Sequence, residues 1–164
     1  MAVESKFLNS DLGTGTLLDA KSNGSGQVKS LVVTGEVAAA DDNGSVYGLF
    51  LINSASGLFS LEVSNDAITS GTDYDVGIYE YDGSGTIGAV VDKDLFADGL
   101  DLSSAADKAN ALTAPNIDEL NKAIWEYAAL SLTSNPDKQY VVAVTANTVG
   151  TGAGTITAHA QVLA

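Results

Sequence analysis

The chain has 164 residues, 45% of them hydrophobic, and carries 21 Asp and Glu against 7 Lys and Arg, for a net charge of −14. This length suits a single domain that buries about 70% of the surface of its unfolded chain. The negative charge repels phosphate backbones and anionic membranes, so neither nucleic acid nor membrane is an expected partner. The chain has no Cys, which excludes disulfides, thiolate metal sites and a cysteine nucleophile, and is typical of synthesis in a reducing cytoplasm.

The first 26 residues are rich in Gly, Ser and Thr and show no hydrophobic period. We expect residues 1–26 to form a flexible N-terminal arm or loop region and residues 27–164 to form a single β-sandwich domain. The start "MAVESKFLNSDLG" lacks the apolar region of a signal peptide, and apolar runs such as "LFLI" at 49–52 are too short to cross a membrane. We therefore expect neither signal-dependent secretion nor membrane insertion.

Short β-branched or aromatic runs bounded by Gly, Asn, Asp and Ser make up most of the remaining chain, which is the pattern of antiparallel strands and turns. The predicted strands are 27–37, 45–53, 58–63, 73–82, 139–149 and 154–164. In the fourth, Tyr74, Val76 and Ile78 alternate with Asp75, Gly77 and Tyr79, which predicts a half-buried strand. The short connections "SASG", "GSGTIG" and "GTGAG" predict hairpins, the last of them closing the final two strands.

The segment "NIDELNKAIWEYAALS" departs from the strand pattern. Its apolar residues follow helical spacing, Asn116 is placed as an N-cap, and Glu119 lies at the N3 position behind it. The pattern predicts one α-helix over about 117–131, inserted before the C-terminal β-hairpin. The capping-box spacing of Ser104 and Asp107 also favours a short helical turn within 103–112.

Many short strands with one inserted helix predict a mainly β chain that folds as an antiparallel β-sandwich. A jelly roll is the favoured form, because eight strands in two sheets need little more than the runs already identified.

The stretch "VVDKDLFADGLDLSSA" at 90–105 suggests a calcium-binding loop, since Asp92, Asp94, Asp98 and Asp101 lie close together in the sequence. An EF-hand loop requires oxygen ligands at positions 1, 3 and 5, Gly at 6 and Glu at 12. Counted from Asp92, these later positions hold Phe96, Ala97 and Ser103, so the EF-hand is excluded. A looser calcium site built from several loops is the alternative. We expect an irregular connection from the strand at 74–81 to the helix, anchored by its apolar residues, with the aspartates in turns.

No catalytic constellation is evident. His159 is the only histidine and alternates with apolar residues on the polar face of a strand with Thr155, Thr157 and Gln161. Zinc is not expected from one His without Cys, no "GxSxG" elbow accompanies a Ser, and the glycine-rich loops lack the P-loop pattern. We therefore predict no catalytic, cofactor-binding or metal site and no enzymatic activity.

Aromatic residues suggest one alternative function. Tyr79 and Tyr81 lie on one face of a predicted strand and, with Trp125, Tyr127 and other tyrosines, could stack against sugars. The alternative is therefore a carbohydrate-binding β-sandwich module, such as a host-attachment component of a virion. The simpler interpretation is that these aromatic residues lie in a core or a subunit interface.

The strings "GTDYDVGIYEYDG" and "GAVVDKDLFADGLDLSSA", between Gly71 and Ala105, resemble a segment of small virion proteins of tailed bacteriophages that are encoded near the major capsid protein. The resemblance implies a head decoration or cement protein. Such a protein is a β-rich, often jelly-roll subunit that binds the capsid exterior, commonly as a trimer, and ties neighbouring major capsid protein subunits together. It is made in the host cytoplasm and resides in the virion.

Overall fold

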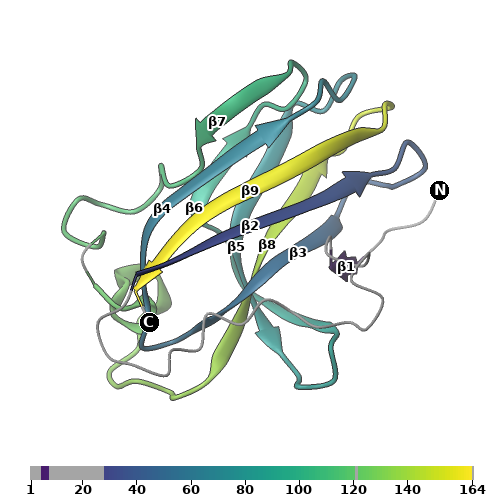
Figure 1. Ribbon diagram of the computed structural model, residues 1–164. Coiled ribbons are helices and arrows are strands. Elements are labelled where there is room, and N and C mark those ends of the chain that lie inside the picture. Colours follow the sequence, from purple (N-terminus) through teal and green to yellow (C-terminus); the bar gives the residue numbers. More distant parts are fainter. Residues whose placement is uncertain (1–4, 8–27, 121, 164) are drawn as a thin grey trace.

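The computed structural model describes residues 5–7, 28–120 and 122–163, so the arm predicted over 1–26 falls largely outside the described residues (Figure 1). The elements are β1 (Ser5–Phe7), β2 (Val28–Val37), β3 (Ser45–Asn53), β4 (Gly57–Asn65), β5 (Asp73–Tyr81), β6 (Ile87–Leu100), β7 (Ala106–Asn110), η2 (Ile124–Glu126), η3 (Ala128–Leu130), β8 (Gln139–Thr148) and β9 (Gly154–Leu163). No helix among these residues is long and apolar enough to cross a membrane.

Two sheets pack face to face as a β-sandwich (Figure 1). One has the order β2-β9-β4-β7, and the other has the order β1-β3-β8-β5-β6, in which the short β1 pairs parallel to β3 at the edge. If the eight antiparallel strands β2 to β9 are numbered 1 to 8, the order β2-β9-β4-β7 becomes 1-8-3-6. In the same numbering, the order β3-β8-β5-β6 becomes 2-7-4-5. This order is that of a jelly roll, so the predicted fold class is confirmed.

The core lies between the sheets and follows from the alternation of side chains along each strand. β9 alternates buried and partly exposed residues along most of its length, with Ile156, Ala158, Ala160 and Val162 turned inward. The largest buried side chains of the core are Tyr47, Phe50, Tyr74, Phe96, Tyr127 and Tyr140. Burial of each such side chain contributes about 1.5–3 kcal/mol to stability.

Two of the predicted hairpins are wrong. β3 and β4 lie in different sheets, as do β8 and β9, so "SASG" and "GTGAG" carry the chain across the sandwich. A short polar connection can either close a hairpin or cross between sheets. The alternation of residues along a strand does not indicate which strand pairs with it. The hairpin at "GSGTIG" is confirmed, because β5 and β6 pair antiparallel up to Tyr81 and Ile87.

The predicted α-helix over 117–131 is also wrong, since the described residues of this segment form short turns, among them the 3-10 turns η2 and η3, and no α-helix. One turn does form where the capping signal lies: the Asn116 N–H donates to Glu119 Oε2 at 2.9 Å. Further along, the N–H groups of Ile124 and Trp125 donate to the carbonyls of Ser56 and Ser54, which an α-helix would not allow. Hydrogen bonds to the β3–β4 connection therefore replace those of the helix.

Strands replace the other irregular segments that the sequence predicted. Residues 103–112 contain β7 rather than a helical turn, and residues 90–105 contain most of β6 rather than a loose connection. β5 is buried on both faces rather than half-buried, with Tyr74 and Asp75 exposed by 0% and 1%. The aspartates at 92–101 had obscured β6 because Asp is depleted in strands.

Replacement of Gly77 by Ala tests how closely β5 and β6 approach. A Cβ at Gly77 would lie 2.0 Å from the Asp92 carbonyl oxygen. We expect Gly77→Ala to lower the free energy of unfolding by about 3 kcal/mol, measured by urea denaturation, because backbone must move. Gly57→Ala in β4 is the matched control, since its nearest contact is 3.4 Å away. Equal effects of the two substitutions would contradict the close approach.

Candidate functional site

β6 carries a large bulge opposite Gly77. Val76 pairs with Ala97 and Ile78 pairs with Asp92, so β6 advances by five residues where β5 advances by two. The backbone of Asp92 and Lys93 lies over the outer face of β5, in the space that a Cβ at Gly77 would need. Bulges of this kind redirect side chains next to them.

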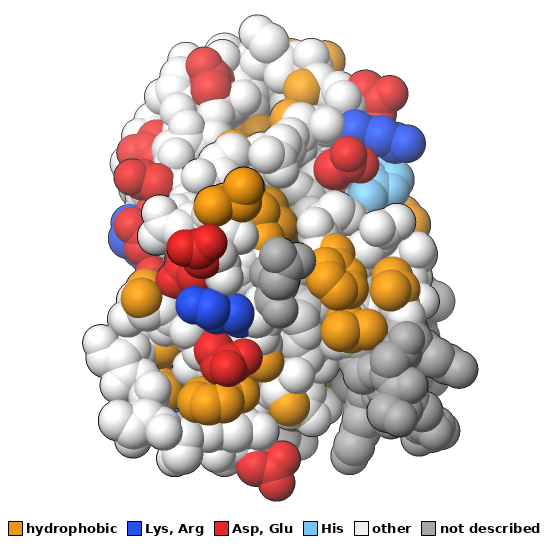
Figure 2. All heavy atoms as spheres, turned by 90° about the vertical axis from the view of Figure 1, so that its left-hand side faces the viewer, with side chains coloured by type: hydrophobic (Ala, Val, Ile, Leu, Met, Phe, Trp, Pro, Cys, Tyr) orange, Lys and Arg blue, Asp and Glu red, His pale blue; other side chains and the backbone are white. Residues whose placement is uncertain are grey.

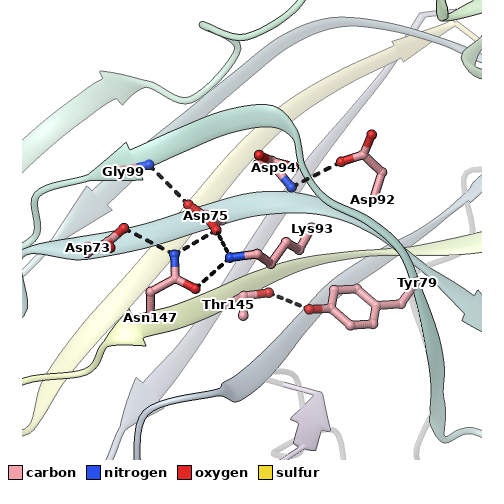
Figure 3. Close-up of polar contacts among 9 residues, drawn as sticks. All are labelled: Asp73, Asp75, Tyr79, Asp92, Lys93, Asp94, Gly99, Thr145 and Asn147. Atoms are coloured by element: carbon pink, nitrogen blue, oxygen red, sulfur yellow. Dashed lines mark hydrogen bonds and ion pairs between the residues drawn. The ribbon is translucent and has the colours of Figure 1, made fainter. Parts of the chain in front are cut away.

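Two further irregularities lie around Asp75 of β5. Gly99 has a φ of 70° and sits where the β5–β6 register shifts between Val76 and Tyr74, as in a bulge that requires glycine. On β8 the register shifts between the partners of Tyr74 and Asp73, which leaves Asn147 as the extra residue. Gly99 N–H and the Asn147 side chain both turn toward Asp75 as a result (Figure 3).

Asp75 is the centre of a polar network on this outer face (Figure 3). Its carboxylate accepts hydrogen bonds from Lys93 Nζ at 2.7 Å, Asn147 Nδ2 at 2.6 Å and Gly99 N–H at 3.1 Å. Burial by itself raises the pKa of Asp75, but these hydrogen bonds outweigh it and the pKa lies below its ordinary value. The hydrogen bond to Asp75 raises the pKa of Lys93 in turn.

Apolar residues continue the covered surface beside this network. Val46, Leu51, Tyr79, Val141 and Ala143 form a second buried cluster on the outer face of β3, β8 and β5, and Tyr81 and Ile87 pack against it. The Tyr79 hydroxyl lies 2.6 Å from the hydroxyl of Thr145, which pairs with Asp75 across the sheet (Figure 3). This sheet is therefore buried on both sides over its central strands, and the hairpin of β5 and β6 contributes to the cover.

A cleft of about 350 Å³ lies between the β6 bulge and the segment that precedes and includes η3. It is lined by Asp92, Asp94, Leu95, Ala114, Pro115, Asn116, Glu119, Tyr127, Ala128 and Ala129. Burial, together with the hydrogen bond and charge of Asp94, raises the pKa of Asp92 to about 6. Glu119 is held by the N–H groups of Asn116 and Ala128, which lower its pKa.

The aspartates of the 90–105 stretch serve different purposes. Asp92 and Asp94 line the cleft, Asp98 is exposed, and Asp101 accepts a hydrogen bond from the Ser103 N–H in a local turn. Within residues 5–7, 28–120 and 122–163, no three His, Asp or Glu side chains lie close enough to hold a metal ion. The arrangement offers hydrogen-bond acceptors and negative charge rather than a ligand set.

His159 lies on the outer face of the four-stranded sheet, as its alternation predicts. It is opposite Val32 of β2 and Glu62 of β4 and is partly exposed. The tyrosines do not form the surface required by the carbohydrate-binding alternative. Five of them are at most 6% exposed, namely Tyr47, Tyr74, Tyr79, Tyr127 and Tyr140, and only Tyr81 is partly accessible.

The grouping of Asp75, Lys93 and Asn147 could not be found from sequence spacing, because three strands bring them together. One local signal pointed to it. An isolated glycine within a strand pattern, here Gly77, indicates a bulge or a close approach of another backbone segment.

Asp92→Asn tests the electrostatics of the cleft. The pKa of Asp92 is about 6 in the folded state and about 3.9 in the unfolded chain, so its cost to stability is absent below about pH 3, builds up between about pH 4 and 6, and is complete above that range. The side chain is partly exposed, so we expect Asp92→Asn to raise the free energy of unfolding by only about 1 kcal/mol at pH 8, and to leave it unchanged at about pH 3. Asp98→Asn removes the same charge from an exposed site on the same strand and is the control. A gain that does not depend on pH, or one shared by Asp98→Asn, would contradict this assignment.

No protein-family model and no curated protein matches the chain. In structure, the chain is similar to a chain from the capsid of Ralstonia phage GP4, with a TM-score of 0.57 and 11% sequence identity. The match covers 90% of this chain and 91% of that one, so the two chains have similar lengths and share the fold over most of each chain.

Proposed function

We propose that the protein is a structural virion component that binds the outside of a phage capsid and stabilises it by bridging major capsid protein subunits. The observation that carries the proposal is the likeness to a chain of the Ralstonia phage GP4 capsid over about nine-tenths of both chains. The role is that of a decoration or cement protein and is not enzymatic.

The charge of the chain supports attachment to a basic surface. Eight Asp and Glu and a single Lys lie between residues 73 and 101, which form β5, β6 and their flanks. Acidic side chains also lie beside hydrophobic ones on the side that carries β7 and the connection from β7 to β8 (Figure 2). Charge complementarity would direct the protein to its place and speed association.

Exposed hydrophobic side chains supply candidate contacts. Ile117 is 80% exposed in the connection after β7, and Val90 on β6 is 57% exposed. Val28 and Val32 on β2 are exposed to a similar degree. A homotrimer would multiply such modest contacts, because once one subunit binds the capsid the others act at high effective concentration.

Binding to capsids that lack the protein is the direct test of function. We expect saturable, stoichiometric binding and a higher temperature of capsid disruption. Binding should weaken as salt is raised, because screening reduces the attraction between charged surfaces. If the protein binds no form of the capsid, the proposal fails.

The oligomeric state is measured separately by light scattering. We expect a mass three times that of the 16.7 kDa chain. A monomeric mass at the concentrations used for capsid binding would remove the trimer from the proposal without removing capsid binding.

A further inference from the structure

Lys93 and Asn147 place an amine against an amide carbonyl. Lys93 Nζ lies 2.8 Å from Asn147 Oδ1 and 2.7 Å from Asp75 Oδ2. Asn147 Nδ2 donates to the same Asp75 oxygen at 2.6 Å and to Asp73 Oδ1 at 3.1 Å. A single buried carboxylate oxygen therefore contacts both the nucleophile and the leaving group of an amide exchange (Figure 3).

We propose that Lys93 and Asn147 form an intramolecular isopeptide bond, with Asp75 transferring the protons. This modification goes beyond the capsid role and does not depend on it.

The reaction balances without an oxidant or a further reactant. Lys93 passes a proton to Asp75, and its neutral Nζ attacks Cγ of Asn147 to form the new C–N bond. The bond from Cγ to Nδ2 breaks, and Nδ2 takes one hydrogen and leaves as ammonia. Of the three hydrogens on Nζ, one stays on the new amide, one leaves with ammonia and one remains on Asp75.

The fold holds these groups in position before any reaction. The β6 bulge turns Lys93 over β5, and the extra residue on β8 turns Asn147 toward it from the opposite side. Asp75 between them is 1% exposed, and Asp73 fixes the orientation of the amide. Reacting groups held in this way behave as if at very high concentration, because the entropy of bringing them together is already lost.

The ion pair between Lys93 and Asp75 slows the formation of the bond. Hydrogen bonding raises the pKa of Lys93 and lowers that of Asp75, so the neutral amine and neutral acid are the minor form of the pair. The Lys93 side chain is also 45% exposed, which favours its charged form. We therefore expect the bond to form slowly, during days of incubation of the folded protein.

The bond would tie the edge strand β6 to the central strand β8 and close a loop over residues 93–147. In a chain without Cys, it would supply the covalent constraint that a disulfide supplies elsewhere.

The intact mass of the denatured protein tests the inference. After incubation of the folded protein for several days at 37 °C, we expect a loss of about 17 Da, one ammonia, and a peptide that joins residues 93 and 147. Lys93→Arg retains the positive charge but has no amine to acylate, so its mass should stay that of its sequence. Its Tm should be lower than that of the linked protein by about 10 °C. Lys138→Arg, at a lysine paired with Glu80, is the matched control and should still lose ammonia.

The same mass loss accompanies succinimide formation, to which Asn-Gly sequences such as Asn23-Gly24 and Asn43-Gly44 are prone. Peptide mapping separates the two reactions, because a succinimide joins no peptides. An unchanged mass after incubation of the folded protein would overturn the inference. So would a loss of about 17 Da whose peptide map contains no peptide that joins residues 93 and 147.

Discussion

The buried carboxylate of Asp75 is the constraint on which this face of the sandwich depends. A charge in a strand that is covered on both sides must be paired and hydrogen-bonded, since the cost of leaving it unpaired is several kcal/mol. Lys93, Asn147 and the Gly99 N–H meet that requirement, and each reaches Asp75 through a bulge in a neighbouring strand. Gly77 is the residue that makes room for the largest of these bulges.

The outer face of the β5 sheet is consequently unusual for a sandwich. Antiparallel sheets commonly leave one face to solvent, but here Tyr79, Val141 and Ala143 form a second buried cluster next to the Asp75 network. A sheet covered on both sides and joined across three strands is difficult to deform, which fits the proposed attachment to a capsid. The acidic cleft beside the β6 bulge and the exposed Ile117 lie outside this rigid part and are open to contact.

The existence of β2, β3, β4, β5, β8 and β9 could be predicted from the sequence, and alternation gave the inward face of β9 and of much of β2. β6 and β7 were not predicted as strands, and β5 proved to be buried on both faces. The partners of each strand could not be predicted, since the short connections at β3–β4 and β8–β9 cross between sheets as readily as they form hairpins. The helix over 117–131 failed because Ser54 and Ser56, far away in sequence, bind the N–H groups that the helix needed. The Asp75 network could not be predicted for a similar reason, because its members come from three different strands. Gly77 is the one residue whose place in the sequence signals a bulge near them.

The proposed attachment to the capsid can be observed by electron cryomicroscopy of capsids incubated with the protein. We expect density for the sandwich on the outer surface, with each subunit or trimer in contact with more than one major capsid protein subunit. Density on the inner surface, or an outer surface that stays bare at saturating protein concentration, would contradict it.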